Sequence, residues 1–165
     1  MTDNNSNISI ANDNPSDESL PKDILIVDDT IENLRLLSDM LTERGYTVRK
    51  ATSGKMTLKV VQTLPPDLIL LDIMLPDING YEVCKLLKEN PETATIPIIF
   101  LSALDDVLDK VRAFGVGGAD YVTKPFHIEE VLIRVNNQLA LKAAHQKICQ
   151  LNAQLEEKVK KHFAK

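Results

Sequence analysis

The sequence predicts a doubly wound α/β domain, in which helices cover both faces of a parallel sheet. Five short runs of mostly apolar residues alternate with segments that carry an apolar residue at every third or fourth position. The first pattern is typical of buried strands and the second of amphipathic helices. Strands that are apolar on both faces need helices on both sides, and the alternation supplies them.

The individual elements follow from these patterns in chain order. The expected strands are 23–29 (DILIVDD), 46–51 (YTVRKA), 67–72 (DLILLD), 96–103 (IPIIFLSA) and 119–124 (ADYVTK). The first helix is expected to begin near Thr30, because Leu34, Leu37 and Leu41 share one face and Gly45 follows as a left-handed cap. Further helices are expected over 54–64, 80–90 and 106–115.

Length and composition limit the classes of function. At 165 residues, the chain has room for one ordinary domain, and its 44% hydrophobic content is enough for a core. The formal net charge of -5 argues against a broad nucleic-acid footprint, which needs a basic face. No apolar run approaches the roughly 18 residues of a membrane span. We therefore expect neither direct nucleic-acid binding nor membrane insertion.

Residues 1–21 are rich in Asn, Asp and Ser and contain few residues that could be buried, so we expect a disordered tail. They lack the basic start and apolar core of a signal peptide. Cys84 and Cys149 have no C-x-x-C motif and no His partner at metal spacing, which indicates neither a disulfide framework nor a zinc site. These features predict a reducing, cytoplasmic location.

The C-terminal segment carries two apolar stripes. From His127 to residue 165 there is no Gly or Pro, which predicts one helix on the order of 58 Å long. The first stripe can pack on the sheet and consists of Ile128, Val131, Leu132, Val135 and Leu139. The second is offset from it and has coiled-coil spacing: Leu141, Ala144, Ile148, Leu151 and Leu155. We therefore expect residues 143–165 to be one of three things: a dimer seam, a rod that couples to another module, or a solvated helix whose end frays.

Carboxylates stand where the first and third expected strands end. An apolar run, 68–71, leads directly into Asp72, and the first strand delivers Asp28 and Asp29. In open α/β sheets the functional crevice lies outside the carboxyl ends of the strands, so we expect these side chains to meet there. Neighbouring acids repel one another and either take up protons or recruit a cation. Hard oxygen ligands favour Mg²⁺, or Mn²⁺, over zinc.

The fourth and fifth strands end in Ser102 and Lys124, which add a hydroxyl and a cation. A carboxylate nucleophile, metal-binding acids, a hydroxyl and a cation are the parts of a phosphoryl-transfer site. Taken singly, each has a plainer explanation. Asp28, Asp29 and Ser102 could cap helices, and Lys124 could be a surface charge. Their gathering at the ends of four strands favours the functional interpretation.

The order and spacing of these motifs resemble the receiver domain of two-component response regulators, over about residues 22–142. "VDD" resembles the acidic pair of that family, and "LLDIMLPDINGYE" resembles its phosphoacceptor loop, with Asp72 at the phosphorylated position. "FLSA" places Ser102 where the family has Ser or Thr. "DYVTKPF" places Lys124 at the invariant lysine and Tyr121 at the aromatic switch position.

The resemblance implies a CheY-like, flavodoxin-like sheet in the strand order 2-1-3-4-5, with a cis peptide bond before Pro125. It also implies a phosphorelay function. Asp72 would accept a phosphoryl group from a sensor histidine kinase or a phosphotransfer protein. The chain would be no enzyme in the ordinary sense, although it would catalyse its own phosphorylation.

The same resemblance implies roles for the neighbouring residues. Mg²⁺ would be held by Asp28 or Asp29, by Asp72 and by the backbone carbonyl of Met74. Lys124 and Ser102 would bind the phosphoryl oxygens, and Ser102 and Tyr121 would form the switch. No active-site residue of the family pattern is missing.

Other α/β proteins fit the sequence less well. A flavodoxin-type electron carrier needs a hydroxyl-rich phosphate loop after the first strand, where this chain has "DDTIEN". A haloacid-dehalogenase-like phosphatase needs a second acid two residues after its nucleophile, where this chain has Met74. A P-loop NTPase needs G-x-x-x-x-G-K-[ST], which is absent from the sequence.

The kind of output stays open at this point. One hypothesis is a freestanding regulator that acts on a downstream protein target and dimerises through its C-terminal helix. Another is the N-terminal receiver of a longer hybrid kinase or cyclase, because "LNAQLEEKVKK" resembles the coiled-coil linkers that join receivers to fused output domains. A third is a receiver-like scaffold that acts by binding without phosphorylation.

Overall fold

The computed structural model describes residues 20–103 and 107–163 and has strands and helices alternating in the expected order. The strands are β1 (Asp23–Val27), β2 (Thr47–Ala51), β3 (Leu68–Asp72), β4 (Ile98–Ser102) and β5 (Asp120–Thr123). The helices are α1 (Ile31–Glu43), α2 (Gly54–Thr63), α3 (Gly80–Glu89), α4 (Val107–Gly115) and α5 (Ile128–Phe163). The strand ends differ from the predicted ones by at most two residues, which is the usual uncertainty of boundaries.

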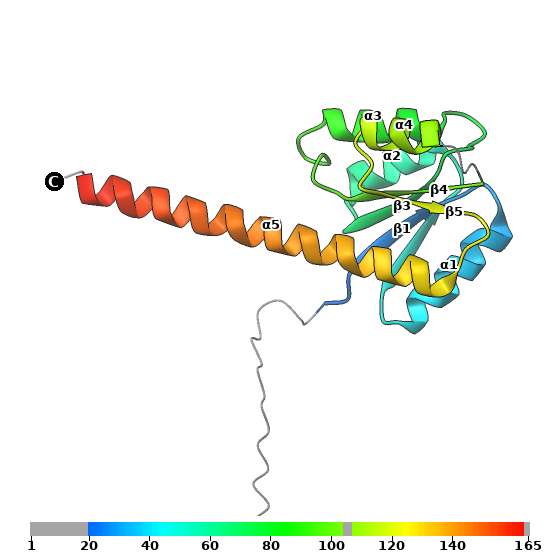
Figure 1. Cartoon of the computed structure of the whole chain (residues 1–165), viewed down its shortest axis with the longest axis horizontal. Helices are drawn as coiled ribbons and strands as arrows, with labels where there is room; N and C mark the ends of the chain where they lie inside the picture. The colour runs from blue at the N-terminus through cyan, green and yellow to red at the C-terminus, as the bar shows by residue number, and fades with distance from the viewer. Residues whose placement is uncertain (1–19, 104–106, 164–165) are drawn as a thin grey trace, which may run out of the picture.

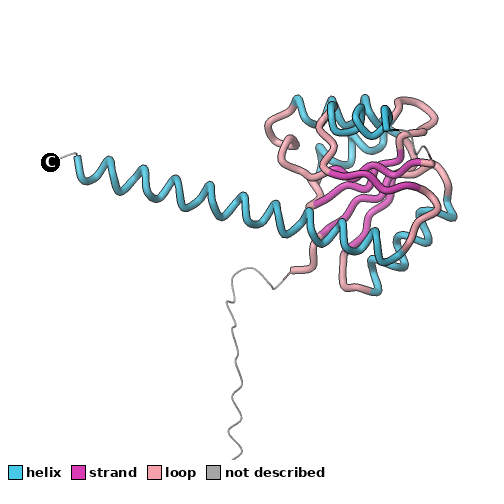
Figure 2. The backbone as a smooth tube through the Cα atoms, viewed as in Figure 1, coloured by secondary structure: helices cyan, strands magenta, loops and turns pink. Residues whose placement is uncertain are grey.

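The strands form one sheet (Figure 2). Their order is β2-β1-β3-β4-β5, and all four pairs of neighbours are parallel. This confirms the predicted doubly wound, flavodoxin-like topology. The strand order reverses beside β1, so the crevice expected for a ligand lies at the carboxyl ends of β1 and β3.

The core consists of two apolar clusters, one on each face of the sheet. Along β1, Leu25 and Val27 belong to the first cluster, whereas Ile24 and Ile26 belong to the second. The first cluster packs under α2, α3 and α4, and the second under α1 and the beginning of α5 (Figure 1). Because successive side chains of a strand point to opposite faces, continuous apolar runs serve both clusters.

Helix α5 is one continuous element of 36 residues, which corresponds to about 54 Å. Its first turns pack on the sheet through Val131 and Val135, which are fully buried. The rest projects from the domain (Figure 1), and every side chain described from residue 143 to residue 162 is exposed. The long helix is therefore confirmed. Of the first stripe, Leu132 and Leu139 also pack on the core, but Ile128 is 47% exposed, so the expectation that it packs on the sheet was wrong.

Smaller expectations have mixed outcomes. Gly45 follows α1 with a φ of 91°, as predicted for a left-handed cap, and the Lys124–Pro125 peptide bond is cis. The predicted tail, 1–21, lies outside the described residues except for Leu20 and Pro21. Among the residues described, no helix is long and apolar enough to cross a membrane.

Candidate functional site

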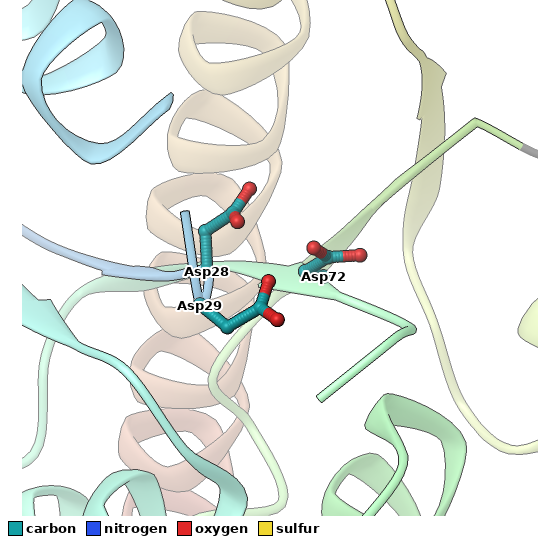
Figure 3. Close-up of side chains that lie close together, drawn as sticks. All are labelled: Asp28, Asp29 and Asp72. Atoms are coloured by element: carbon teal, nitrogen blue, oxygen red, sulfur yellow. The ribbon is translucent and has the colours of Figure 1, made fainter. Parts of the chain in front are cut away.

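Three aspartates gather at the carboxyl ends of β1 and β3. Val27 pairs with Leu71 across these strands, so Asp28 and Asp72, the residues that follow them, are neighbours on the rim. Asp28 is fully buried and Asp72 is 3% exposed, whereas Asp29 is exposed. One carboxylate oxygen from each aspartate lies within 4.8 Å of the other two (Figure 3). The predicted acidic cluster is therefore present.

Lys124 brings the positive charge to this cluster. It follows β5, and its Nζ lies 3.0 Å from Asp72 Oδ2 and 3.2 Å from Asp28 Oδ2. Its backbone N–H donates to the carbonyl of Ser102 (2.7 Å), which ties the end of β5 to the end of β4. Because the ammonium bridges two buried carboxylates, the surface-charge explanation does not apply to this lysine.

Further hydrogen bonds orient the two buried carboxylates. Asp28 Oδ1 accepts from the backbone N–H of Thr30 (2.9 Å), and Asp28 Oδ2 accepts from Asn33 Nδ2 (3.2 Å). Asp72 Oδ1 accepts from the backbone N–H of Met74 (3.1 Å). Asp28 is not the N-cap of α1, because that position is Thr30, but its side chain bonds the N–H of Thr30 and Asn33 in the first turn and also contacts Lys124. The two contacts are compatible, because the N–H of Thr30 binds Oδ1 of Asp28 and the ammonium of Lys124 binds Oδ2.

Charge and burial perturb the ionisation of the site. Burial raises the pKa of Asp72 above its ordinary value, and the charge of Asp28 adds to the rise. The hydrogen bond from Lys124 lowers this pKa but does not outweigh them. Burial lowers the pKa of Lys124, but the hydrogen bond and charge of Asp72, together with Asp28, outweigh it, so this pKa is raised. Lys124 therefore stays protonated, and a single ammonium faces two buried carboxylates and a third nearby.

A hydroxyl and an aromatic ring complete the set. Ser102 ends β4 and is 1% exposed, and Leu101 pairs with Asp72 on the neighbouring strand. Tyr121, on β5, is 5% exposed and packs in the cluster under α2 to α4. Its ring therefore already occupies a buried position. The side chain of Met74, by contrast, is 67% exposed.

The carboxylate set is suited to a small divalent cation. Six oxygens around Mg²⁺ at about 2.1 Å span at most about 4.2 Å, so oxygens within 4.8 Å of one another need only small rotations to meet an ion. The exposed Asp29 leaves one side open to water, which Mg²⁺ retains in most protein sites. The ligand chemistry fits Mg²⁺ or Mn²⁺ and not zinc, because the cluster contains neither thiolate nor imidazole.

Sequence reasoning missed three polar contacts. Asn33 escaped notice because an asparagine on a helix usually faces solvent, and Asp77 because an acid beside a proline usually marks a turn. Asp77 binds the start of α2 instead, through the backbone N–H groups of Gly54 and Lys55. The expectation that Cys149 has no His partner was wrong, because His145 Nε2 lies 3.7 Å from its sulfur, one helical turn away. Two exposed side chains alone do not form a metal site.

The chain is similar to known proteins over the part that contains this site. It is 44% identical over 112 residues to the DNA-binding dual master transcriptional regulator RpaA of Synechocystis sp., covering 68% of this chain and 46% of that protein. It is 39% identical over 136 residues to a Vibrio cholerae protein named as a probable cyclic di-GMP phosphodiesterase, covering 82% of this chain and 31% of that protein. The chain thus spans less than half the length of these curated relatives.

A solved structure has the same fold. Chemotaxis response regulator CheY4 of Vibrio cholerae is 27% identical, with a TM-score of 0.69 over 72% of this chain and 99% of that one. The chain also matches the model of the response regulator receiver domain over residues 24–136, a range that contains the acidic cluster and every strand residue of the sheet except Asp23, the first residue of β1. Sequence, fold and site agree, and the chain belongs to the response regulator receiver domain family.

Proposed function

We propose that this chain is a phosphoacceptor module in which Asp72 takes a phosphoryl group from a phosphohistidine of a partner protein. Receiver domains of two-component systems work with histidine kinases or phosphotransfer proteins, and with output domains. The observation that carries the proposal is the contact of Lys124 Nζ with both Asp72 (3.0 Å) and Asp28 (3.2 Å). This contact supports the proposal because it brings the carboxylate that would accept the phosphoryl group next to the cation that would bind it.

The transfer balances with the residues present. A carboxylate oxygen of Asp72 attacks the phosphorus, the bond between phosphorus and the histidine nitrogen breaks, and the electron pair returns to the imidazole. No general base is needed, because an ionised carboxylate has no proton to lose. Lys124 and the hydroxyl of Ser102 would then hold the phosphoryl oxygens, since both groups donate hydrogen bonds.

Receiver domains bind Mg²⁺ at an acidic pocket, and the acidic cluster fits that ion. In this chain Asp28, Asp29 and Asp72 would hold it, together with the backbone carbonyl of Met74. When bound, the ion supplies positive charge that offsets the negative charge of the incoming phosphoryl group. The buried aspartates gain from the same charge, because it relieves the repulsion between them.

Ser102 and Tyr121 would convert phosphorylation into a change of surface. A phosphoryl group on Asp72 gives Ser102 a new acceptor and draws it towards the rim. Tyr121 is already buried, so phosphorylation would stabilise this position of the ring and disfavour an outward one. The elements expected to feel the change are β5, which carries Tyr121, α4, whose Lys110 lies over the ring, and α5, which packs against β5 on the other face of the sheet.

The projecting part of α5 would carry the signal onward, as half of a two-stranded coiled coil. The seam residues are exposed: Leu141 (62%), Ile148 (56%), Leu151 (50%) and Leu155 (59%). Ile148 lies 13 positions after Val135 in the chain. At 3.6 residues per turn, this spacing puts the two side chains about 140° apart around the helix. A second copy can therefore pair with the seam while the first stripe stays packed on the sheet.

The same coupling serves two arrangements, a freestanding dimeric regulator or the receiver of a longer protein. The curated relatives are longer than this chain, and one is named for a phosphodiesterase activity, which supports a fused output domain. In either arrangement we infer a cytoplasmic setting, because both cysteines are free thiols.

The decisive experiment is Mg²⁺-dependent phosphorylation by acetyl phosphate or phosphoramidate, measured by intact mass on the wild type and on Asp72→Asn. We expect a gain of about 80 Da that requires both Mg²⁺ and Asp72. The association state, measured by sedimentation in the same samples, should shift on phosphorylation. An Ile148→Glu variant, in which the seam carries a charge, should be phosphorylated normally and stay monomeric.

Other outcomes have definite meanings. A folded wild type that binds Mg²⁺ and gains no mass would contradict the phosphoacceptor proposal and favour a receiver-like scaffold that acts by binding alone. A mass gain without any change of association would leave the acceptor role intact and contradict the coupling through α5.

A further inference from the structure

The loop between Asp72 and α3 makes an unusual contact with α2. Asp77, in the middle of this loop, accepts hydrogen bonds from the backbone N–H groups of Gly54 (2.8 Å, Oδ1) and Lys55 (2.9 Å, Oδ2). These N–H groups begin α2 and have no partner within the helix. A carboxylate at a helix N-terminus is also stabilised by the helix dipole. The hydrogen bond from Lys55, with that from Gly54, lowers the pKa of Asp77 to about 2, so the group is an anion at working pH.

A second contact shows that the loop and α2 meet closely. A Cβ atom added at Gly54 would lie 3.1 Å from both the Cβ and the carbonyl oxygen of Ile78, and 3.0 Å from the side chain of Val83. Glycine at this position therefore lets the first turn of α2 rest against the loop. Ile78 is partly buried and packs on the core cluster that also contains Val83.

The ends of the same loop are fixed to the strand that carries Asp72. The backbone N–H of Gly80 donates to the carbonyl of Ile73 (2.8 Å), and a Cβ at Gly80 would collide with the carbonyl oxygen of Asp72. The N–H of Met74 holds Asp72 Oδ1 at the other side. The loop is thus anchored at both ends by backbone contacts and in its middle by the carboxylate of Asp77.

We propose that Asp77 is a positioning residue for the cation site, because it clamps the loop to α2 and thereby holds the backbone of Met74 against the acidic cluster. The inference rests on the proposed function, in which the carbonyl of Met74 is a ligand of Mg²⁺. Asp77 itself touches neither the ion nor the phosphoryl group. Losing the clamp leaves the carboxylates in place and lets the carbonyl drift, so the affinity for the ion falls while the acceptor stays intact.

The test compares two ways of weakening the same helix start. Asp77→Ala removes the clamp from the loop, whereas the matched control Ser53→Ala removes a hydrogen bond that Ser53 Oγ accepts from the N–H of Met56 (3.1 Å) within α2 itself. Mg²⁺ affinity is measured by titration calorimetry on the unphosphorylated full chain, and thermal unfolding is followed in parallel. Asp77→Asn, which keeps one acceptor oxygen, is a third variant and replaces Asp77→Ala if the latter does not fold.

We expect Asp77→Ala to weaken Mg²⁺ binding about tenfold, the lower end of the range for residues that orient metal ligands. Asp77→Asn should fall between it and the wild type, and Ser53→Ala should change the affinity less than about twofold even though it removes a cap. The rate of phosphorylation should fall with the affinity at low Mg²⁺ and return to the wild-type value at saturating Mg²⁺. A loss that stems only from unfolding would not be restored in this way.

Two results would overturn the proposal. If Asp77→Ala and Ser53→Ala bind Mg²⁺ equally well while the wild type binds the ion and gains the phosphoryl group, the clamp is structural and only this inference fails. If the wild type binds no Mg²⁺, the proposed function fails together with it.

Discussion

The rim of the sheet and the projecting half of α5 differ in what determines their arrangement. At the rim, Asp28 and Asp72 follow or end runs of buried strand residues, and each is held by hydrogen bonds and by Lys124. Along α5 from residue 143 to residue 162, the described side chains are all exposed. The rim is thus fixed by contacts within this chain, whereas the exposure of the projecting half of α5 leaves its state to the proposed coiled-coil partner.

This difference fits the two tasks of a receiver domain, phosphoryl transfer and signalling. Phosphoryl transfer requires groups that are positioned before the partner arrives, because misplacement of reacting atoms lowers the rate steeply. Signalling requires an element with two states of similar free energy, which a helix that buries little surface in its own domain can provide. Only Lys124 of the rim is close in the chain to the helix, since α5 begins at Ile128, four residues later, and continues into the seam.

The largest contrast is expected in the chemistry of the two thiols. Cys84 is fully buried and burial raises its pKa to about 11, whereas Cys149 lies exposed on the projecting helix. We expect Cys149 to react with a disulfide reagent at pH 7.5. The reaction of Cys84 should be slower by at least about 10³-fold, because its labelling requires opening of the core. Equal rates in the native protein would contradict this, and Cys149→Ser should remove the fast phase.

A pair of isoleucines makes the same comparison in terms of stability. Ile99 is fully buried in β4, and Ile148 is 56% exposed on α5. Ile99→Ala should lower the free energy of unfolding by about 2–5 kcal/mol, through lost burial and the cavity left behind. Ile148→Ala should change it by less than about 0.5 kcal/mol in dilute protein. Urea unfolding measures both, and a large effect of Ile148→Ala in monomers would show that the helix packs on its own domain.

Much of the fold and of the rim could be predicted from the sequence. Apolar runs such as that of β3 define buried strands, and parallel strands bring their carboxyl ends to one edge, so Asp28, Asp72 and Lys124 had to be near neighbours. The exposed seam followed from the spacing of Leu141, Ile148 and similar residues.

Other features depend on tertiary contacts that periodicity does not encode. The clamp between Asp77 and α2 joins residues 22 or 23 positions apart in sequence, and a loop acid gives no sign of its acceptor. The buried position of Tyr121 depends on how α4 packs over β5, and both inward and outward rings fit the same sequence. Capping of α1 was one of two alternatives for Asp28, but Thr30 is the N-cap and Asp28 bonds the backbone N–H of that residue.

The smallest effect concerns how much the buried charge of Asp72 destabilises the folded protein. The pKa of Asp72 is raised in the fold, so the folded state binds this proton more tightly than the unfolded chain, whose value is near 3.8. The contribution of protonated Asp72 to the free energy of unfolding is therefore fully present below about 3.8 and is lost as the pH rises through the raised pKa. Asp72→Asn, which stays neutral, should raise the Tm of the metal-free protein by about 2–4 °C at pH 7.5. The gain should shrink as the pH falls towards 3.8, and Mg²⁺ should reverse it by stabilising only the ionised wild type. A constant difference across this range would mean that packing of the amide, and not the charge of Asp72, sets the stability of the rim.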